Sequence, residues 1–432
     1  HAIEAQIART EGATHVALRQ QEQSRNRLPG LHRNLPINFH GTYCRDCCYK
    51  VFAIPNSPLH RGLTMRCFYQ FKTTLSLVVL AVFVAFSSLD VPGFPATAER
   101  LAAASAPLQG GPASRPSAAQ EYDPLAPITA LEIGRISLTA LRGEREVPIL
   151  VFLPKRGDAA KLLDPLPIVL FSHGLGGSNT GSTFYGQHLA SRGYAVAFLQ
   201  HAGSDEQVWK DLPAGKRLSA LEQAATRENL VLRTQDVTTA IDALTTWNQT
   251  KGHPLEGRVD PERIGMSGHS FGAVTTQMVS GQRSEIFQAK LIEPRIDAAI
   301  AFSPSPPRLG TPKKVFDKVF LPLMLMTGTK DDSSIGNTDA KARQLVYPAL
   351  PTTNDRYELV LDGARHSIFT DTAGIRRASA RNRNHHRVIL ALATAFWDAY
   401  LKQDRQAAAW LVGDGPKGVM EEADRYQHAA GE

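Results

Sequence analysis

From about residue 126 onward, short apolar runs alternate with amphipathic stretches. Unbroken apolar runs, such as residues 167–171, are typical of strands buried on both faces of a parallel sheet. In the amphipathic stretches, such as residues 228–247, apolar side chains recur at the spacing of a helix with one buried face. Strands are predicted over residues 167–171, 194–199, 263–267, 298–302, 323–326 and 357–361, and helices over 183–191, 228–247, 388–401 and directly after residue 270. This alternation predicts an α/β fold with a mostly parallel central sheet and helices on both faces.

Two runs that precede this pattern differ from it. Residues 135–140 alternate polar and apolar side chains, and residues 147–153 are mostly apolar. The Arg142-Gly143-Glu144 segment between them suits a tight turn, because glycine adopts the backbone angles that such turns require. An antiparallel hairpin is therefore predicted at the start of the domain.

Composition divides the chain into five parts. Residues 126–404 carry the alternating pattern and are predicted to form one folded α/β domain. Residues 99–125 are rich in Ala, Pro, Gly and Ser, which is typical of a flexible linker. Residues 65–98 read as a signal peptide, residues 1–64 as a disordered upstream extension of the reading frame, and residues 405–432 as a C-terminal tail.

The signal-like segment has the three parts of a secretory signal peptide. It begins with basic residues around Arg66, continues with an apolar run over residues 75–86, and ends in Ala96-Thr97-Ala98. The apolar run is shorter than the roughly 20 residues that a helix needs to cross a bilayer. We expect an exported protein, periplasmic or secreted, after cleavage at Ala98 or with the segment retained as a membrane anchor.

The net charge of +7 does not indicate a nucleic-acid partner, because most of it lies outside the predicted domain. Residues 1–98 hold 10 Lys/Arg against 5 Asp/Glu, a net of +5, and the remainder holds 38 against 36, a net of +2. The predicted domain is therefore nearly neutral and has no basic stripe. We expect no nucleic-acid partner, and contact with a membrane only through the signal segment.

The cysteines give no indication of a metal site. All four lie in the first 98 residues, at Cys44, Cys47, Cys48 and Cys67. Cys44 and Cys47 have the spacing of half a zinc site, but no second Cys/His pair at ligand spacing accompanies them. No metal or cofactor is predicted, and a domain of this size has enough core to fold without disulfides.

Candidate chemistry begins at Gly268-His269-Ser270-Phe271-Gly272, between a predicted strand and a predicted helix. This is the context of a nucleophile elbow, in which a serine sits on a sharp, strained turn. The residues two before and two after that serine must be small enough to clear the neighbouring backbone. Because both are glycine, Ser270 is predicted to be a nucleophile.

A serine nucleophile needs a base to take its proton and an acid to orient that base. Asp331 and Asp332 follow the predicted strand at residues 323–326, and His366 follows the one at residues 357–361. The carboxyl ends of parallel strands are where α/β sheets bind ligands, and the order Ser, Asp, His is the one such hydrolases use. We predict Asp331 as the acid, with Asp332 as the alternative, and His366 as the base.

The tetrahedral intermediate also needs hydrogen-bond donors for its oxyanion. The loop Ser172-His173-Gly174-Leu175-Gly176-Gly177 follows a predicted strand, and its glycines allow backbone N–H groups to turn inward. It matches neither of the Gly-rich phosphate-binding motifs. The N–H groups of Leu175 and Phe271 are the predicted donors, with His173 as a brace for the loop. Residues 201–226 are predicted to form an insertion over the pocket, with Trp209 as a candidate lining residue.

Three separated segments, residues 172–176, 189–197 and 268–272, resemble the α/β-hydrolase fold. Within it they resemble the platelet-activating-factor acetylhydrolases and the bacterial dienelactone-hydrolase-like and cutinase-like serine esterases. The resemblance covers about residues 126–401 and implies the same nucleophile, base and oxyanion donors. The acid departs from the acetylhydrolase pattern, in which it ends the strand after the elbow helix, where this chain has Ser303. The Asp331 loop instead resembles the acid loop of the other esterases.

Together these features predict an exported serine esterase that hydrolyses small-molecule or lipid esters without a cofactor. Two other hypotheses remain open. One is a non-catalytic hydrolase-fold protein that binds at the cell envelope, and the other is an acyltransferase or peptidase on the same fold.

Overall fold

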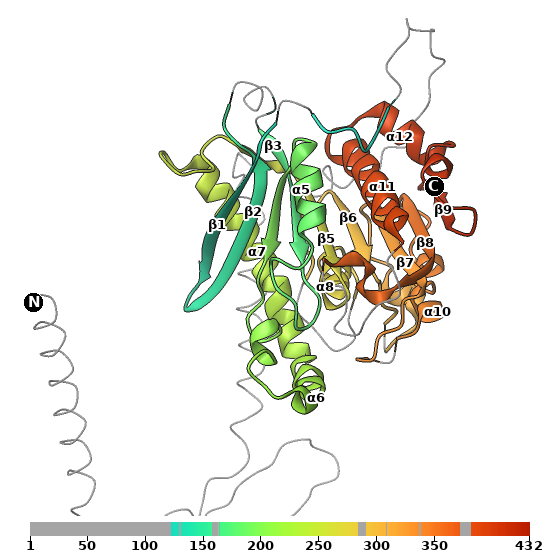
Figure 1. Cartoon of the computed structure of the whole chain (residues 1–432), viewed down its shortest axis with the longest axis horizontal. Coiled ribbons are helices and arrows are strands. Elements are labelled where there is room, and N and C mark those ends of the chain that lie inside the picture. Colours follow the sequence, from blue (N-terminus) through green and yellow to red (C-terminus); the bar gives the residue numbers. More distant parts are fainter. Residues whose placement is uncertain are drawn as a thin grey trace, which may run out of the picture. The chain divides into compact units, whose positions relative to one another are not determined.

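The computed structural model describes residues 122–128, 131–157, 163, 165–283, 291–307, 309–336, 338–371 and 382–432. These residues form a nine-stranded sheet in the order β1-β2-β4-β3-β5-β6-β7-β8-β9 (Figure 1). The strands are β1 (Ile133–Arg142), β2 (Arg145–Pro154), β3 (Leu166–Ser172), β4 (Ala195–Leu199), β5 (Val259–His269), β6 (Ala298–Phe302), β7 (Leu323–Lys330), β8 (Arg356–Arg365) and β9 (Arg425–Ala429). Strands β4, β3, β5, β6, β7 and β8 are parallel, and the pairs at both edges are antiparallel. The predicted fold class is confirmed.

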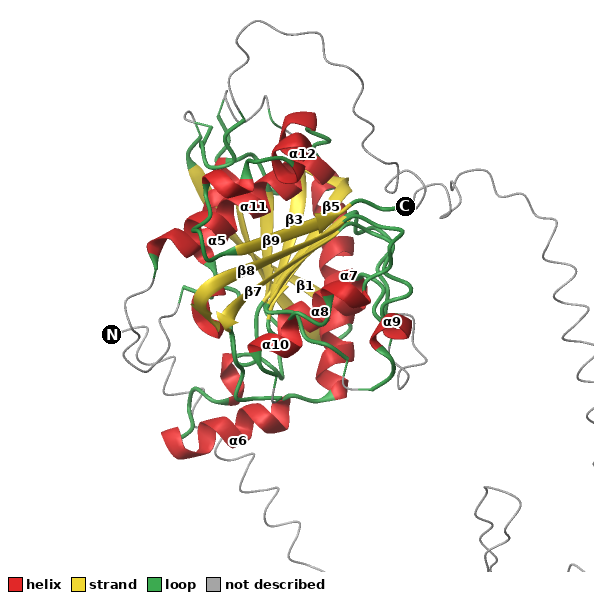
Figure 2. Cartoon of the chain, turned by 90° about the vertical axis from the view of Figure 1, so that its right-hand side faces the viewer, coloured by secondary structure: helices red, strands yellow, loops and turns green. Residues whose placement is uncertain are grey.

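Helices cover both faces of this sheet (Figure 2). Alternate residues of a strand face opposite sides, so the strands divide the apolar core in two. Val169 and Phe171 of β3 pack with α5 and α11, whereas Ile168 and Leu170 pack with α7 and α8. The helices are α5 (Thr183–Ser191), α6 (Ala214–Ala224), α7 (Arg227–Gln249), α8 (Phe271–Val279), α9 (Pro312–Val315), α10 (Ala340–Arg343), α11 (Arg383–Leu401) and α12 (Arg405–Val412). Short 3-10 turns are η1 (Glu206–Val208), η2 (Tyr347–Ala349), η3 (His366–Phe369) and η4 (Pro416–Gly418).

The predicted opening hairpin is confirmed. Strands β1 and β2 pair antiparallel from Ile133 opposite Pro154 to Arg142 opposite Arg145. Gly143 in the turn has a φ of 60°, which glycine adopts without strain. Through β2, which pairs with β4, the hairpin becomes one edge of the main sheet.

Strand ends set the position of the candidate site, and three strands are longer than their apolar runs predict. Strand β5 runs to His269 and stops at Ser270. Strand β7 extends to Lys330, and β8 extends to Arg365. Polar residues continue these strands because their backbone groups stay paired in the sheet. Asp331 and His366 are consequently the first residues beyond two neighbouring strands.

The prediction that residues 405–432 form a C-terminal tail outside the domain is wrong. These residues form α12, which packs against α11, and β9, which adds an antiparallel strand beside β8. Asp404 caps α12 by accepting the N–H groups of Gln406 and Ala407. The pattern is misleading because β9 is a short edge strand of mostly polar residues. Its Tyr426 nevertheless stacks on Tyr357 of β8.

The folded domain also begins a few residues before the predicted start at residue 126. Most of the predicted linker, together with the predicted extension and signal segment, lies outside the described residues. The end of that linker, residues 122–125, packs on the domain, and Tyr122 Oη donates a hydrogen bond of 2.8 Å to Asp398 of α11. Within the described ranges, no helix is both long and apolar enough to cross a membrane.

Candidate active site

The residue between β5 and α8 is Ser270, and its backbone is strained. It has φ 59° and ψ −113°, in a region that residues with a side chain rarely enter. The flanking glycines are necessary, because a Cβ at Gly268 would collide with the Gly272 carbonyl, and one at Gly272 would collide with the Ser172 carbonyl. This is the geometry of a nucleophile elbow, with Ser270 at the mouth of a cavity.

The structure brings Ser270, His366 and Asp331 together in a chain of hydrogen bonds. The Nε2 atom of His366 lies 2.9 Å from Ser270 Oγ, and its Nδ1 atom lies 2.6 Å from Asp331 Oδ1. Because an ionised carboxylate only accepts, Nδ1 carries the proton and Nε2 is left to accept from the serine hydroxyl. The histidine side chain is 25% exposed and the aspartate is fully buried. This arrangement can deprotonate Ser270 and stabilise the resulting imidazolium.

Asp331 is held in place and kept ionised by its neighbours. Thr327 Oγ1 donates to its Oδ2 at 2.8 Å, and Arg343 Nε lies 3.0 Å from its Oδ1. Burial opposes ionisation, but the hydrogen bond from His366 and the positive charge of Arg343 lower the pKa of Asp331 below its ordinary value. Asp332, the alternative, is exposed and accepts the backbone N–H of Ala340 instead.

Two residues that contact the Ser270–His366–Asp331 series of hydrogen bonds were not predicted from the sequence. Buried Arg343 donates to the Asp331 and Ser303 carbonyls at 2.8 Å each, so it joins the ends of β6 and β7. Its Nη2 also lies 3.3 Å from His366 Nδ1, but the shorter carboxylate contact holds the ring proton. His269 Nε2 donates to the His366 carbonyl at 2.9 Å, and burial lowers the pKa of His269 to about 3. The elbow motif contains His269, but no local pattern marks Arg343.

The predicted oxyanion donors lie on the same cavity as Ser270. Phe271 is the first residue of α8, so its N–H has no acceptor within the helix, and Leu175 approaches from the loop after β3. His173 braces that loop, since its Nδ1 donates to the Gly174 carbonyl at 2.7 Å and its Nε2 accepts the His201 N–H at 3.1 Å. Burial lowers the pKa of His173 well below 6.5, so the ring is neutral.

The cavity has a volume of about 610 Å³, and apolar and polar side chains contribute to its lining in about equal number. The apolar side chains come mostly from the loop at residues 172–177 (the oxyanion loop), from α6 to α8 and from the loop after β6, and include Leu175, Leu218, Leu230, Val274, Met278 and Leu309. Many of the polar ones come from the loop after β7, including Asp332 and Ser333. The predicted insertion at residues 201–226 therefore contributes to the cavity through Leu218. Trp209 does not line it. Its Nε1 donates to the Gly176 carbonyl at 2.7 Å, and it packs behind the oxyanion loop.

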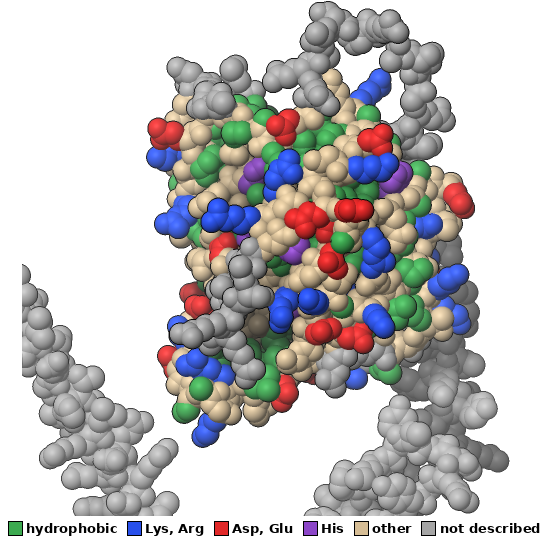
Figure 3. Space-filling view, turned by 45° about the vertical axis from the view of Figure 1, so that its right-hand side comes forward, with side chains coloured by type: hydrophobic (Ala, Val, Ile, Leu, Met, Phe, Trp, Pro, Cys, Tyr) green, Lys and Arg blue, Asp and Glu red, His purple; other side chains and the backbone are tan. Residues whose placement is uncertain are grey.

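Charged and metal-binding groups give no second kind of site. On the face shown in Figure 3, basic and acidic side chains are interspersed rather than gathered by sign. In the part of the chain that the structure describes, no three His, Cys, Asp or Glu side chains gather as metal ligands.

The sheet order and flanking helices have the architecture of the α/β hydrolases, and Ser270, His366 and Asp331 have the geometry of a serine-type triad. Residues 151–209 match the family described as platelet-activating factor acetylhydrolase, isoform II. A platelet-activating factor acetylhydrolase from Cavia porcellus is 24% identical over 259 residues, covering 54% of this chain and 54% of that protein. The chain thus spans about half the length of the curated relative that it matches. These matches confirm the predicted resemblance to the acetylhydrolases, which are serine carboxylic ester hydrolases.

The family match covers only part of the site. It contains β3, the oxyanion loop, α5 and β4, but ends before Ser270, Asp331 and His366. The catalytic roles of these three residues consequently remain predictions, supported by their geometry.

Proposed function

We propose that this protein is an exported serine esterase that hydrolyses carboxylic esters through an acyl-enzyme. The observation that carries the proposal is the chain of 2.9 and 2.6 Å contacts from Ser270 through His366 to Asp331 at the mouth of the cavity. Both contacts lie within hydrogen-bonding range before any substrate is present. A hydrolase fold retained only for binding would not need this alignment.

In the proposed reaction, Ser270 Oγ attacks the ester carbonyl carbon while His366 Nε2 takes its proton. The oxyanion accepts hydrogen bonds from the N–H groups of Leu175 and Phe271. His366 then protonates the departing alcohol, which leaves an acyl group on Ser270. Water attacks the acyl-enzyme as His366 takes its proton, and the carboxylic acid is released as Ser270 recovers its hydrogen. Asp331 keeps the imidazole in the required tautomer throughout.

Turnover of p-nitrophenyl acetate and butyrate by the purified full-length chain tests this proposal. The Ser270→Ala variant is the matched control, because it removes one oxygen atom and leaves the packing unchanged. We expect its kcat to fall by at least about a thousandfold. Equal turnover by the wild type and this variant would refute the esterase proposal. A parallel measurement with p-nitroanilides and added alcohols separates esterase from peptidase and acyltransferase activity.

The apolar part of the cavity lining supports small-molecule or lipid esters as substrates. Each methylene group buried in such a cavity contributes about 0.8 kcal/mol, so kcat/KM should rise about fourfold per methylene until the cavity is full. A series of p-nitrophenyl esters from acetate to dodecanoate measures this directly. Constant kcat/KM along the series would show that the acyl chain does not enter the cavity.

Export is proposed from the sequence of residues 65–98. Fractionation of expressing cells, followed by amino-terminal sequencing of the exported protein, tests it. We expect the mature chain to begin at Glu99, or the intact chain to remain in the membrane fraction if the segment is an anchor. Full-length protein in the soluble cytoplasmic fraction would contradict export.

A further inference from the structure

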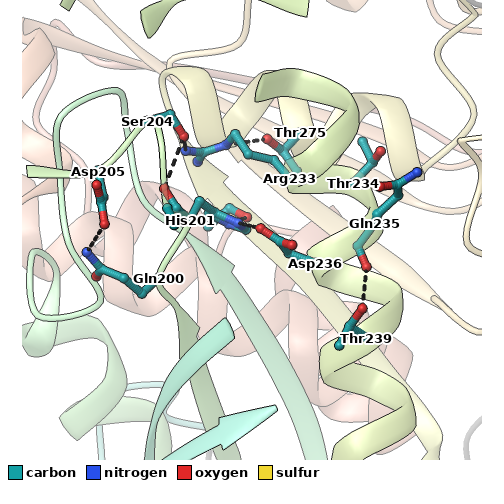
Figure 4. Close-up of polar contacts among 12 residues, drawn as sticks. Gln200, His201, Ser204, Asp205, Arg233, Thr234, Gln235, Asp236, Thr239 and Thr275 are labelled. Atoms are coloured by element: carbon teal, nitrogen blue, oxygen red, sulfur yellow. Dashed lines mark hydrogen bonds and ion pairs between the residues drawn. The ribbon is translucent and has the colours of Figure 1, made fainter. Parts of the chain in front are cut away.

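Figure 4 shows a buried polar network around His201 and Asp236, which contacts the oxyanion loop through Ser172 and His173. Ser172 Oγ lies 2.8 Å from His201 Nε2, and His201 Nδ1 lies 3.0 Å from Asp236 Oδ2. Asp236 also receives two hydrogen bonds of 2.7 Å from Arg145. Burial lowers the pKa of His201 to about 4, so the neutral ring donates from Nδ1 and accepts the Ser172 hydroxyl at Nε2. Ser172, His201 and Asp236 are fully buried, so this second Ser-His-Asp series is structural.

Arg233 of α7 lies beside this network and contacts three segments around the site (Figure 4). Its Nε donates to Thr275 Oγ1 of α8 at 3.0 Å, and its Nη1 donates to Ser204 Oγ at 3.0 Å. Its Nη2 donates to the His173 carbonyl in the oxyanion loop. The guanidinium also lies over the ring of Phe271, 4.9 Å from the ring centroid.

These contacts reach the backbone near both predicted oxyanion donors. On the loop side, the His173 carbonyl is two residues before Leu175, and the Ser204 carbonyl accepts the Gly176 N–H at 2.9 Å. On the helix side, Thr275 Oγ1 donates to the Phe271 carbonyl at 3.0 Å while it accepts from Arg233. One side chain thus connects the two segments whose N–H groups must converge on a single oxygen atom.

The charge state of Arg233 makes this arrangement costly for the fold. Its side chain is fully buried, and its three hydrogen-bond acceptors are neutral. Burial lowers the pKa of Arg233 to about 9, although Asp236 and Asp205 partly compensate, so the group remains cationic at pH 7. Burying a charge without a directly paired counter-ion costs free energy that neutral hydrogen-bond acceptors offset only in part. Packing alone therefore does not account for an arginine at this position.

We propose that Arg233 is a positioning residue for the oxyanion hole, which holds the loop at residues 172–177 and the start of α8 in register and adds a fixed positive charge behind them. This inference rests on the proposed esterase function. A preorganised donor or charge acts on the oxyanion of the transition state and much less on the neutral ester. Loss of Arg233 should therefore lower kcat and leave KM nearly unchanged.

Arg233→Met and Arg233→Lys test this inference, with Arg258→Met as the matched control. Arg258 is also buried, but it precedes the amino end of β5, and its guanidinium donates to the carbonyl of Pro154, the last residue of β2, away from the site. The assays measure kcat and KM per folded molecule, and calorimetry measures the affinity of butylboronic acid, which forms an anionic tetrahedral adduct with the serine. Boronate binding does not depend on turnover of any chosen ester.

For Arg233→Met we expect kcat to fall tenfold to a few hundredfold, KM to change less than about threefold, and boronate affinity to fall with kcat. Arg233→Lys, which keeps the charge but not the three-way contact, should recover part of both losses. Arg258→Met should reduce stability without changing kcat per folded molecule. Unchanged kcat and boronate affinity in Arg233→Met, or losses equal to those of Arg258→Met, would overturn the inference. Failure of the proposed function appears separately, as wild-type hydrolysis that is insensitive to Ser270→Ala.

Discussion

The neighbouring carboxylates Asp331 and Asp332 allow a direct test of the acid assignment. Asp331 Oδ1 lies 2.6 Å from His366 Nδ1, whereas Asp332 accepts only a backbone N–H among the hydrogen bonds of the described residues. Replacing each in turn by asparagine preserves side-chain size and removes one negative charge. The two variants therefore differ mainly in whether the lost charge faces the imidazole.

The size of the effect follows from the geometry. In Asp331→Asn, Arg343 Nε lies 3.0 Å from the Oδ1 position, so it favours the amide oxygen there, and His366 keeps its tautomer. What is lost is the attraction between the carboxylate and the imidazolium that forms during the reaction. With charge centres about 4 Å apart and an effective dielectric constant of about 20, this attraction is about 4 kcal/mol. That energy corresponds to a fall in kcat of about a thousandfold.

Asp331→Asn also leaves buried Arg343 without a charged partner at that position. The free energy of unfolding of the variant should therefore fall by roughly 3 kcal/mol. Rates must therefore be expressed per folded molecule, with the folded fraction taken from circular dichroism. For Asp332→Asn we expect kcat within about threefold of the wild type, because that side chain is exposed and, among the described residues, its hydrogen bond comes from the Ala340 N–H rather than from His366. A larger kcat loss in Asp332→Asn than in Asp331→Asn would refute this reasoning.

Three further predictions concern stability. Gly272→Ala should lower both the melting temperature and the activity, because the added Cβ would collide with the Ser172 carbonyl. Gly215→Ala should instead raise the free energy of unfolding by up to about 1 kcal/mol, because the added Cβ meets nothing within 4 Å and alanine favours the helix. Burial lowers the pKa of His201 to about 4 and that of His269 to about 3, so between pH 6.5 and pH 4 the unfolded chain binds protons that the folded chain does not. Urea denaturation should therefore show about 2 kcal/mol lost per histidine between pH 6.5 and pH 5, and a flat profile would contradict these burial effects. Removal of residues 413–432 should lower the melting temperature and promote association, because it removes β9 and exposes the edge of β8. Light scattering measures the association. An unchanged melting temperature and an unchanged molecular mass would show that β9 is dispensable.

The strand ends explain why much of the site could be predicted from the sequence. Apolar runs locate parallel strands, and the residues that follow them meet at one edge of the sheet. This rule places Ser270, Asp331 and His366 together without any knowledge of side-chain contacts. It does not distinguish Asp331 from Asp332, because that choice depends on which of two successive side chains turns toward His366.

The residues that could not be predicted act through long-range polar contacts. Arg343 lies in a four-residue helix and Arg233 in the middle of a long one, and each reads locally as an ordinary polar position. Their roles depend on carbonyl groups 60 residues away for Arg233 and 40 residues away for Arg343. Strand β9 was missed for a related reason, since its place in the sheet depends on pairing with β8 and on the contact of Tyr426 with Tyr357, which its own composition does not indicate.

The tight turn between β1 and β2 has a consequence for protein engineering. Gly143 and Glu144 are exposed at its tip, which makes the turn an attractive place to insert a tag or reporter domain. However, the next residue, Arg145, donates two hydrogen bonds to Asp236, which accepts a hydrogen bond from His201 beside the oxyanion loop. Strain that an insertion places on this turn would therefore be transmitted through these side chains to the candidate site. The same coupling makes the turn a suitable point for building a sensor in which the proposed esterase activity reports on strain in an inserted domain.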